Sequence, residues 1–267
     1  MARISISGDP TEEALALPFV VIGRRQTRVF LIALACLALS VVSWAAVSRA
    51  AARGGTDPNL VWYVQTDEPV IALTFDDGPD PKYTPQVLET LRRFGAKATF
   101  FVIGRNVEQY PDVLKQVAAD GHEIGNHTYS HPLRLRKEGN GEVAQQLTKT
   151  AELVAQLTGQ QTRVFRPPGG AYNGNLVGVA KSLGYEVIIW SWTTNPSDAY
   201  APGVAQIVHR VTDDAAPGDI VLLHDGNPHP QTVNALPEIL RILSEKGFRF
   251  VTVSELLRLR GPEATGR

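Results

Sequence analysis

The chain has 267 residues, a formal net charge of −1 at pH 7 and no run of basic residues, which argues against a nucleic-acid partner. Its single cysteine, Cys36, excludes a disulfide within the chain, so a stable fold depends on the core and on any bound metal. The roughly 190 residues that follow position 67 suffice for one substantial core.

The first predicted element is an apolar segment, residues 29–47, which holds 19 residues without a charge. At about 1.5 Å per residue it is long enough to cross a bilayer core of roughly 30 Å. Three arginines precede it (Arg24, Arg25 and Arg28), which favours a cytoplasmic N-terminus. We therefore predict a single-pass protein of the cell membrane. The alternative is a secreted protein, because Ser43-Trp44-Ala45 resembles a signal-peptide cleavage site.

The anchor divides the chain into four predicted parts. Residues 1–28 form a short cytoplasmic tail, 29–47 the transmembrane anchor, 48–67 a linker, and 68–260 one extracytoplasmic catalytic domain. No obligate protein partner is evident, and the membrane is the expected partner of the anchor.

The domain opens with a buried strand that ends in two acids. Residues 71–75 are apolar and β-prone, and Asp76, Asp77, Gly78 and Pro79 follow at once. Adjacent carboxylates at the end of a buried strand raise each other's energy of ionisation, and a divalent cation is the usual agent that offsets this cost. A plain turn is the alternative, since Asp-Asp-Gly-Pro is ordinary turn chemistry.

The next informative pair is His127 and His131. If their segment is helical, the two imidazoles share one face and chelate one ion. Two histidines and one carboxylate give three ligands and leave a coordination position open for water, which is typical of a catalytic metal site. Taken alone, such a pair is more often two surface residues.

Apolar runs and amphipathic segments alternate along the rest of the domain. Strands are predicted at 164–166, 186–190 and 219–223, with a weaker one at 123–124, and helices at 84–93, 106–120, 142–157, 175–183, 204–211 and 232–245. This alternation predicts an α/β fold with a parallel sheet, whose active site lies at the carboxyl ends of the strands. Asp76, Asp77, Arg166 and His224 all occupy such ends.

With these residues together, the chain from about 69 to 257 resembles the polysaccharide deacetylase family, also called the NodB-homology domain or carbohydrate esterase family 4. The resemblance implies a distorted (β/α) barrel with fewer than eight full repeats and a bound divalent metal, usually Zn²⁺ or another transition metal such as Co²⁺. It also implies hydrolytic removal of acetyl groups from a polysaccharide. The matching motifs are Thr74-Phe-Asp-Asp-Gly78, His127-Thr-Tyr-Ser-His131, Arg166-Pro-Pro-Gly-Gly170 and Leu222-Leu-His224.

Carried over residue by residue, the resemblance assigns a role to each motif. Asp77, His127 and His131 would bind the metal. Asp76 would be the general base that acts on the metal-bound water, with Arg166 orienting it. His224 would be the general acid that protonates the departing amine, a role that suits imidazole near neutral pH.

The substrate-binding assignments rest on weaker matches. Leu222 would border the acetyl pocket, and the backbone N–H near Gly169 would bind the oxyanion, although many relatives carry Tyr at that position. The family's Asp-Trp motif is altered here, so Asp198 is the best candidate for the acid that tunes His224, and Tyr200 would partly replace the Trp. Asp225, next to His224, is a second candidate orienter.

We expect an acetylated amino-sugar polymer as the substrate, with the N-acetylglucosamine of peptidoglycan as the leading choice. Three alternatives stay open. One is a polysaccharide-binding relative with impaired catalysis, one is an esterase acting on O-acetylated xylan or chitin-type polymers, and one is an iron oxygenase with two histidines and one carboxylate.

Overall fold

The computed structural model describes residues 31–32, 34–38, 40, 53–226 and 230–260, and the chain divides into two compact units, Met1–Ser48 and Arg49–Arg267. The described residues of the first unit are helical. Within the described ranges, no helix is both long enough and apolar enough to span a bilayer. The predicted tail, 1–28, and most of the predicted anchor, 29–47, lie outside these ranges.

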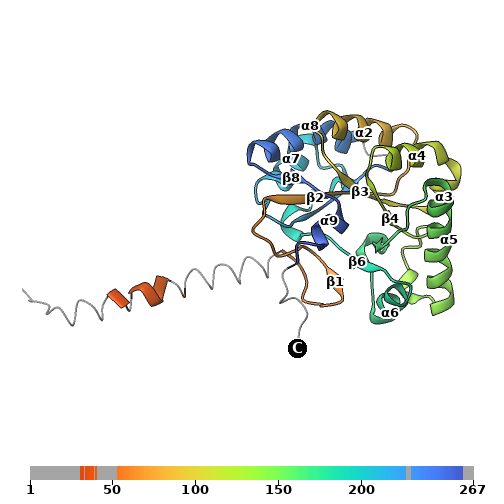
Figure 1. Ribbon diagram of the computed structural model, residues 1–267, viewed down its shortest axis with the longest axis horizontal. Coiled ribbons are helices and arrows are strands. Elements are labelled where there is room, and N and C mark those ends of the chain that lie inside the picture. The colour runs from red at the N-terminus through yellow and green to blue at the C-terminus, as the bar shows by residue number, and fades with distance from the viewer. Residues whose placement is uncertain (1–30, 33, 39, 41–52, 227–229, 261–267) are drawn as a thin grey trace, which may run out of the picture. The chain divides into compact units, whose positions relative to one another are not determined.

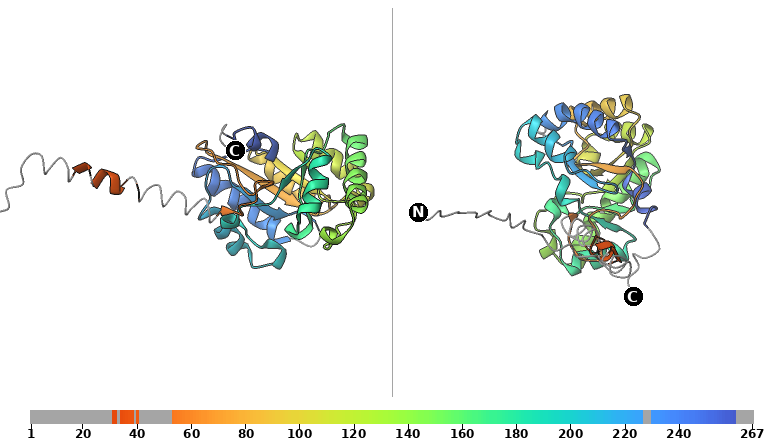
Figure 2. Two further views of the ribbon diagram at one scale, coloured as in Figure 1. Left: turned by 90° about the horizontal axis from the view of Figure 1, so that it is seen from below. Right: turned by 90° about the vertical axis from the view of Figure 1, so that its left-hand side faces the viewer.

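The second unit is built on a curled sheet of eight strands (Figures 1 and 2). The order is β1-β6-β5-β4-β3-β2-β7, with β8 also paired to β2, and all pairs are parallel. The strands are β1 Leu60–Val61, β2 Val70–Asp76, β3 Ala98–Val102, β4 Glu123–Asn126, β5 Val164–Phe165, β6 Glu186–Ile188, β7 Ile220–His224 and β8 Arg249–Phe250. An isolated antiparallel bridge between Tyr63 and Asp219 joins the chain beside β1 to the chain beside β7. The sheet therefore forms an incomplete barrel, as predicted.

Helices cover the outer face of this sheet (Figure 1). They are α2 Tyr83–Arg93, α3 Gly104–Gln109, α4 Pro111–Ala119, α5 Asn140–Thr158, α6 Gly174–Ser182, α7 Val204–Thr212 and α8 Pro230–Glu245. Short 3-10 turns η1 to η4 occupy Leu135–Lys137, Pro168–Gly170, Trp192–Thr194 and Asp198–Tyr200, and α9 spans Val253–Leu257. Helices must cover a parallel sheet because its strands are apolar on both faces.

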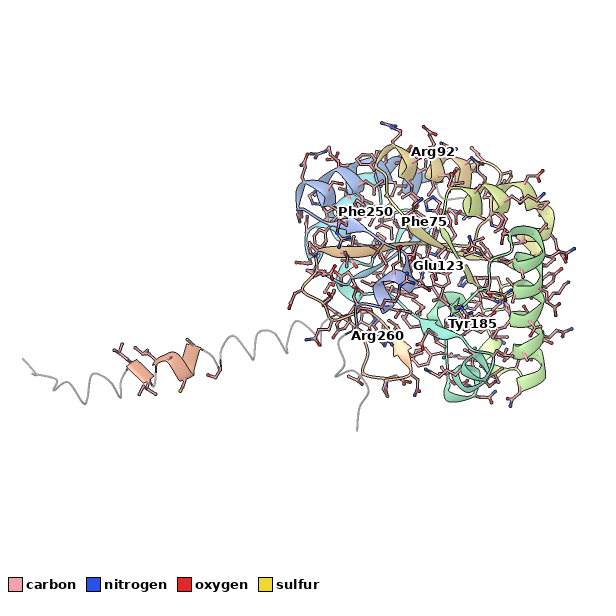
Figure 3. All side chains as sticks on the ribbon, in the orientation of Figure 1. Phe75, Arg92, Glu123, Tyr185, Phe250 and Arg260 are labelled. Atoms are coloured by element: carbon pink, nitrogen blue, oxygen red, sulfur yellow. The ribbon has the colours of Figure 1, made fainter. Side chains whose placement is uncertain are left out.

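The alternation of side chains along β2 creates two separate cores. Leu73 and Phe75 belong to a cluster with residues of α2 and α8 (Phe75 is labelled in Figure 3), whereas Ala72 belongs to a cluster inside the barrel. Val253 and Leu256 of α9 are part of the inner cluster. Thr74 and Asp76 lie further along the inward face of β2, so the carboxyl end of the barrel interior is polar.

Two boundaries differ from the sequence prediction. The predicted helix 106–120 is interrupted at Tyr110, because Pro111 cannot donate the backbone hydrogen bond that continues a helix. The predicted linker 48–67 contains β1, which pairs with β6. The side chain of Arg53 also binds Asp219 at 2.7 Å, so the folded domain includes residues before 68.

Candidate active site

The polar residues predicted at strand ends lie together at the carboxyl edge of the sheet. Asp76 and His224 are the last residues of β2 and β7 and are register partners. His127 directly follows β4, and Arg166 directly follows β5. Because parallel strands end at the same edge, separate segments of the chain bring these side chains to one place.

Asp77, His127 and His131 form the one cluster of potential metal ligands found in the described part of the chain, with one ligand atom of each within 4.8 Å of the others. Asp77 Oδ1 lies 3.5 Å from His127 Nε2 and 3.3 Å from His131 Nε2. Two ligands bound at about 2.1 Å to a tetrahedral zinc ion stand about 3.4 Å apart. Asp77 Oδ1 is also buried without a hydrogen-bond partner. The three side chains therefore fit a small divalent cation, which would satisfy that oxygen.

The surroundings of His127 prepare its Nε2 atom as a ligand. Its Nδ1 atom is 2.7 Å from the backbone oxygen of Arg166. Because a carbonyl oxygen only accepts, Nδ1 carries the proton and Nε2 keeps its lone pair toward Asp77. Burial lowers the pKa of His127 to about 3, so the ring is neutral near pH 7, the form that binds metals.

The segment that carries both histidines is a loop, so the conditional prediction of a helix is wrong. Thr128 and His131 have positive φ angles of 71° and 56°. Gln146 of α5 holds the loop, because its Oε1 accepts hydrogen bonds from the backbone N–H groups of Tyr129 and Ser130 at 3.0 and 2.9 Å. These anchored left-handed turns place the two imidazoles at the shared ligand position.

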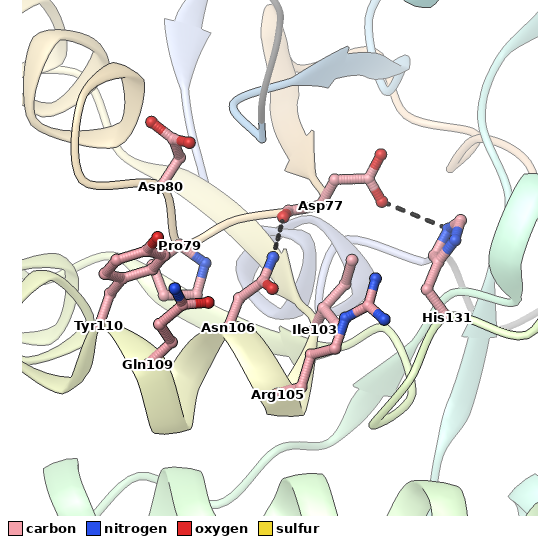
Figure 4. A pocket seen from close by; sticks show the side chains of 9 residues that line it. All are labelled: Asp77, Pro79, Asp80, Ile103, Arg105, Asn106, Gln109, Tyr110 and His131. Carbon is pink, nitrogen blue, oxygen red and sulfur yellow. Dashed lines mark hydrogen bonds and ion pairs between the residues drawn. The ribbon is translucent and has the colours of Figure 1, made fainter.

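Asp77 is held in a similarly unusual conformation. Its φ angle is 73°, and its backbone oxygen accepts a 2.8 Å hydrogen bond from Asn106 Nδ2 (Figure 4). Gly226 packs against it so closely that an added Cβ would lie 2.5 Å from Asp77 Cβ. Contacts from two other segments therefore fix the carboxylate toward the histidines.

The neighbouring acid, Asp76, has a different partner. Its Oδ1 accepts a 2.7 Å hydrogen bond from Arg166 Nη1, which also donates to Thr74 Oγ1 at 2.7 Å. The fully buried guanidinium donates again to the backbone oxygen of Ile189 and lies 4.2 Å from the centre of the Phe101 ring. Burial raises the pKa of Asp76, and the charge of Arg166 opposes this rise. Asp76 is thus an oriented carboxyl more basic than usual.

His224 forms a second oriented pair, with Asp198. Its Nδ1 atom is 2.7 Å from Asp198 Oδ1, and its backbone N–H donates to Asp198 Oδ2 at 2.8 Å. The hydroxyl of Thr232 donates to the same Oδ2 at 2.6 Å. Burial alone would lower the pKa of His224, but Asp198 outweighs burial and raises it to about 9. Asp225 accepts a hydrogen bond from Thr84 instead. Of the two acids that were candidates for orienting His224, Asp198 is therefore the one that bonds to it.

The three residues expected to contact the substrate have fewer contacts with the rest of the site. Leu222 is on the same strand as His224, two residues before it, and is largely buried. Gly169 has a φ of 60° and lies beside Leu133, which follows the histidine loop. Tyr200 is 86% exposed in η4, beyond Asp198. The structure thus places Leu222 on the strand of His224 and Gly169 beside Leu133, and it leaves the Tyr200 side chain in solvent.

Several supporting residues were not predicted from the sequence. They bond to residues of the site from outside the motifs: Asn106, Gln146, Thr232 and Thr84. Each lies on a helix, where a polar residue most often faces solvent, so little in the sequence marked these residues as part of the site. Thr74, which bonds to Arg166, is a supporting residue that the sequence does indicate. The alternation of side chains along β2 places it on the same face as Asp76.

Comparisons with known proteins agree with this geometry. The family model described as "Polysaccharide deacetylase" matches residues 63–188. A peptidoglycan-N-acetylglucosamine deacetylase of Bacillus cereus is 47% identical over 202 residues, covering 75% of this chain and 94% of that protein. A chitooligosaccharide deacetylase of Azorhizobium caulinodans is 38% identical over 191 residues, covering 67% of this chain and 90% of that protein.

A solved structure is similar as well. The crystal structure of the Bc1960 peptidoglycan N-acetylglucosamine deacetylase superposes with a TM-score of 0.71 at 34% sequence identity. The match covers 74% of this chain and 92% of that chain. The likeness thus extends over nearly the whole of the relative.

Proposed function

Because the chain belongs to the polysaccharide deacetylase family, we propose that it hydrolyses the acetamide of N-acetylglucosamine in peptidoglycan with the help of a divalent metal. The proposal places the catalytic domain outside the cytoplasm, where that polymer lies, with residues 29–47 as the anchor. A curled parallel sheet alone would suit many chemistries, so the argument depends on the site rather than on the fold.

One observation carries the proposal: three potential metal ligands lie at the same sheet edge as a carboxyl held by an arginine and an imidazole held by an acid. Asp76, held by Arg166, has its Oδ2 3.7 Å from the Nε2 atom of the ligand His127. His224, held by Asp198, ends the adjacent strand, opposite Asp76. A base and an acid around one cation are the groups that amide hydrolysis requires.

We propose zinc as the metal, because two imidazoles and one carboxylate are one of the ligand sets of catalytic zinc sites. When bound, the cation would supply Lewis-acid activation of a water molecule and of the acetyl carbonyl. Asp77, His127 and His131 would hold it. The neutral ring of His127 and the unpaired Oδ1 of Asp77 support this assignment.

The protein's own groups would then move the protons. Asp76 accepts a proton from the attacking water, and its burial makes it a stronger base than an exposed carboxylate. Asp198 raises the pKa of His224 to about 9 in the metal-free protein, which favours the protonated ring that would donate a proton to the amine nitrogen as the C–N bond breaks. The products are acetate and a free amino sugar. Leu222 would border the acetyl methyl, and the backbone N–H of Gly169 would stabilise the oxyanion.

The test is acetate release by the purified domain from peptidoglycan, chitin oligomers and acetylxylan, each with EDTA and with added Zn²⁺ or Co²⁺. We expect zinc-dependent release that is fastest from peptidoglycan. Faster release from chitin oligomers would favour the activity named for the Azorhizobium relative, and preference for acetylxylan would favour an esterase. Absence of release from all three polymers with metal present would contradict the proposed function.

A further inference from the structure

The structure contains an open cavity that extends from the proposed metal ligands to residues that the proposed reaction does not use. Its volume is about 320 Å³, and its lining includes Asp77 and His131 at one side and Arg105, Gln109 and Tyr110 of the α3–α4 region. Small-molecule sites range from roughly 300 to 1,000 Å³. The cavity therefore has room for one further unit of a bound chain, next to the unit whose acetyl group is removed.

Among the residues that line this cavity, Arg105 supplies a guanidinium, which is a positively charged hydrogen-bond donor. Figure 4 shows its guanidinium on the His131 side and Asp80 on the other side. Within the described residues, the Arg105 side chain forms no hydrogen bond or ion pair, and it is exposed. In contrast, Oδ1 of Asp80 is already engaged by the backbone N–H groups of Lys82 and Tyr83, both at 2.8 Å.

Backbone hydrogen bonds fix the Cα of Arg105 beside the proposed metal ligands. Its N–H donates to the backbone oxygen of Tyr129 at 2.9 Å, so α3 is tied to the loop that carries the histidines. The next residue, Asn106, bonds to the backbone of Asp77. Arg105 is therefore held by the same contacts that hold the ligands, and its position relative to them does not depend on a mobile segment.

We propose that Arg105 determines specificity by binding a carboxylate on the sugar unit next to the one that is deacetylated. A guanidinium binds a carboxylate through two parallel hydrogen bonds, whereas it gains little from a neutral sugar. In peptidoglycan that carboxylate belongs to the lactyl group of N-acetylmuramic acid or to the attached peptide. Chitin-type chains carry none. The inference rests on the proposed function and adds the residue that would separate acidic from neutral polymers.

The experiment compares Arg105→Ala with wild type on three substrates of equal chain length. The first is a peptide-free tetrasaccharide of N-acetylglucosamine and N-acetylmuramic acid, with free lactyl carboxylates. The second is the same tetrasaccharide with those carboxylates converted to amides. The third carries peptides, so that only peptide carboxylates remain. The kcat/KM for acetate release is measured on each, at low and at high salt.

We expect Arg105→Ala to lower kcat/KM about tenfold, or about 1.4 kcal/mol, on at least one acidic substrate and less than twofold on the amide. Arg105→Lys should recover part of the loss, and high salt should reduce the wild-type preference for acid over amide. Loss on the first substrate would identify the lactyl group, and loss on the third the peptide. Equal loss on the amide, or no loss on any substrate, would overturn the proposal.

Two controls separate this inference from the proposed function. Arg93→Ala removes another exposed, unpaired arginine, at the end of α2, and should leave all three rates unchanged. Calorimetric binding of the first two tetrasaccharides to the metal-free protein should show the same dependence on Arg105 without turnover. If wild type releases no acetate, the proposed function fails. If wild type is active but Arg105→Ala loses nothing selectively, only the specificity proposal fails.

Discussion

Replacing Asp198 by asparagine should remove the charge that keeps His224 protonated. Asparagine has nearly the same size, so the cavity around the pair stays filled. Burial, which already opposes protonation, would then be opposed only by the charges of Asp76 and Asp77. We therefore expect the pKa of His224 to fall well below 9.

The size of the effect follows from the same pKa values. The rise from 6.5 to about 9 corresponds to roughly 3 kcal/mol of interaction between the protonated ring and its surroundings. Because the folded protein binds this proton more tightly than the unfolded chain, the contribution is fully present below pH 6.5. It is lost as the pH rises through 9. Asp198→Asn should thus lower the free energy of unfolding by up to about 3 kcal/mol at pH 6, and by less at pH 10.

The measurement is urea unfolding of the metal-free protein across this pH range, together with NMR titration of the His224 ring. Metal-free protein is needed because a nearby dication would itself lower the pKa of His224. Asp213→Asn is the matched control, since Asp213 faces His209 on an exposed part of α7 and its loss should change stability little. A His224 pKa that stays near 9 in Asp198→Asn would refute the assignment of Asp198 as its cause.

Four further substitutions test the site. Asp76→Asn should abolish acetate release while zinc affinity stays within about threefold of wild type. His127→Ala should lose both acetate release and zinc binding. Calorimetric zinc titration and an acetate assay distinguish the two variants. Gly226→Ala should weaken zinc binding about tenfold or more with the fold retained by circular dichroism, because the new Cβ displaces Asp77. In metal-free protein, Asp225→Asn should stabilise the fold by up to about 4 kcal/mol at pH 8 and little at pH 4, because burial raises the pKa of Asp225 to about 7. Equal urea midpoints for Asp225→Asn and wild type at pH 8 would contradict this.

Elements with a strong local pattern were predicted best. The helix predicted at 84–93 is α2, Tyr83–Arg93, and the one at 142–157 is α5, Asn140–Thr158. Strands β1, β5 and β8 have only two residues each, which is too short for any periodicity. Of these, only β5 was predicted, because Arg166 and a Pro-Pro-Gly-Gly turn follow its apolar residues. Strand β3, Ala98–Val102, follows a turn and precedes a helix, and its uniform apolar run does not distinguish strand from helix.

For the site as well, the motifs indicate which residues take part, whereas the contacts that orient them depend on the fold. Residue types and their order pointed to Asp77, His127 and His131 as ligands, because few other roles require that combination. The tautomer of His127 depends on the backbone of Arg166, 39 residues away in the sequence. Such contacts are set by topology, so a single sequence does not display them.

The adjacent acids illustrate why the backbone matters as much as the residue types. In an extended strand, successive side chains point to opposite faces, so Asp77 would face the helices if β2 continued past Asp76. The φ of 73° at Asp77 turns the chain and brings both carboxylates to the inner side. A left-handed conformation costs a non-glycine residue about 1 kcal/mol or more. Contacts from Asn106 and Gly226 offset that cost. Two acids next to each other in sequence thereby reach different partners, one the arginine and the other the histidines.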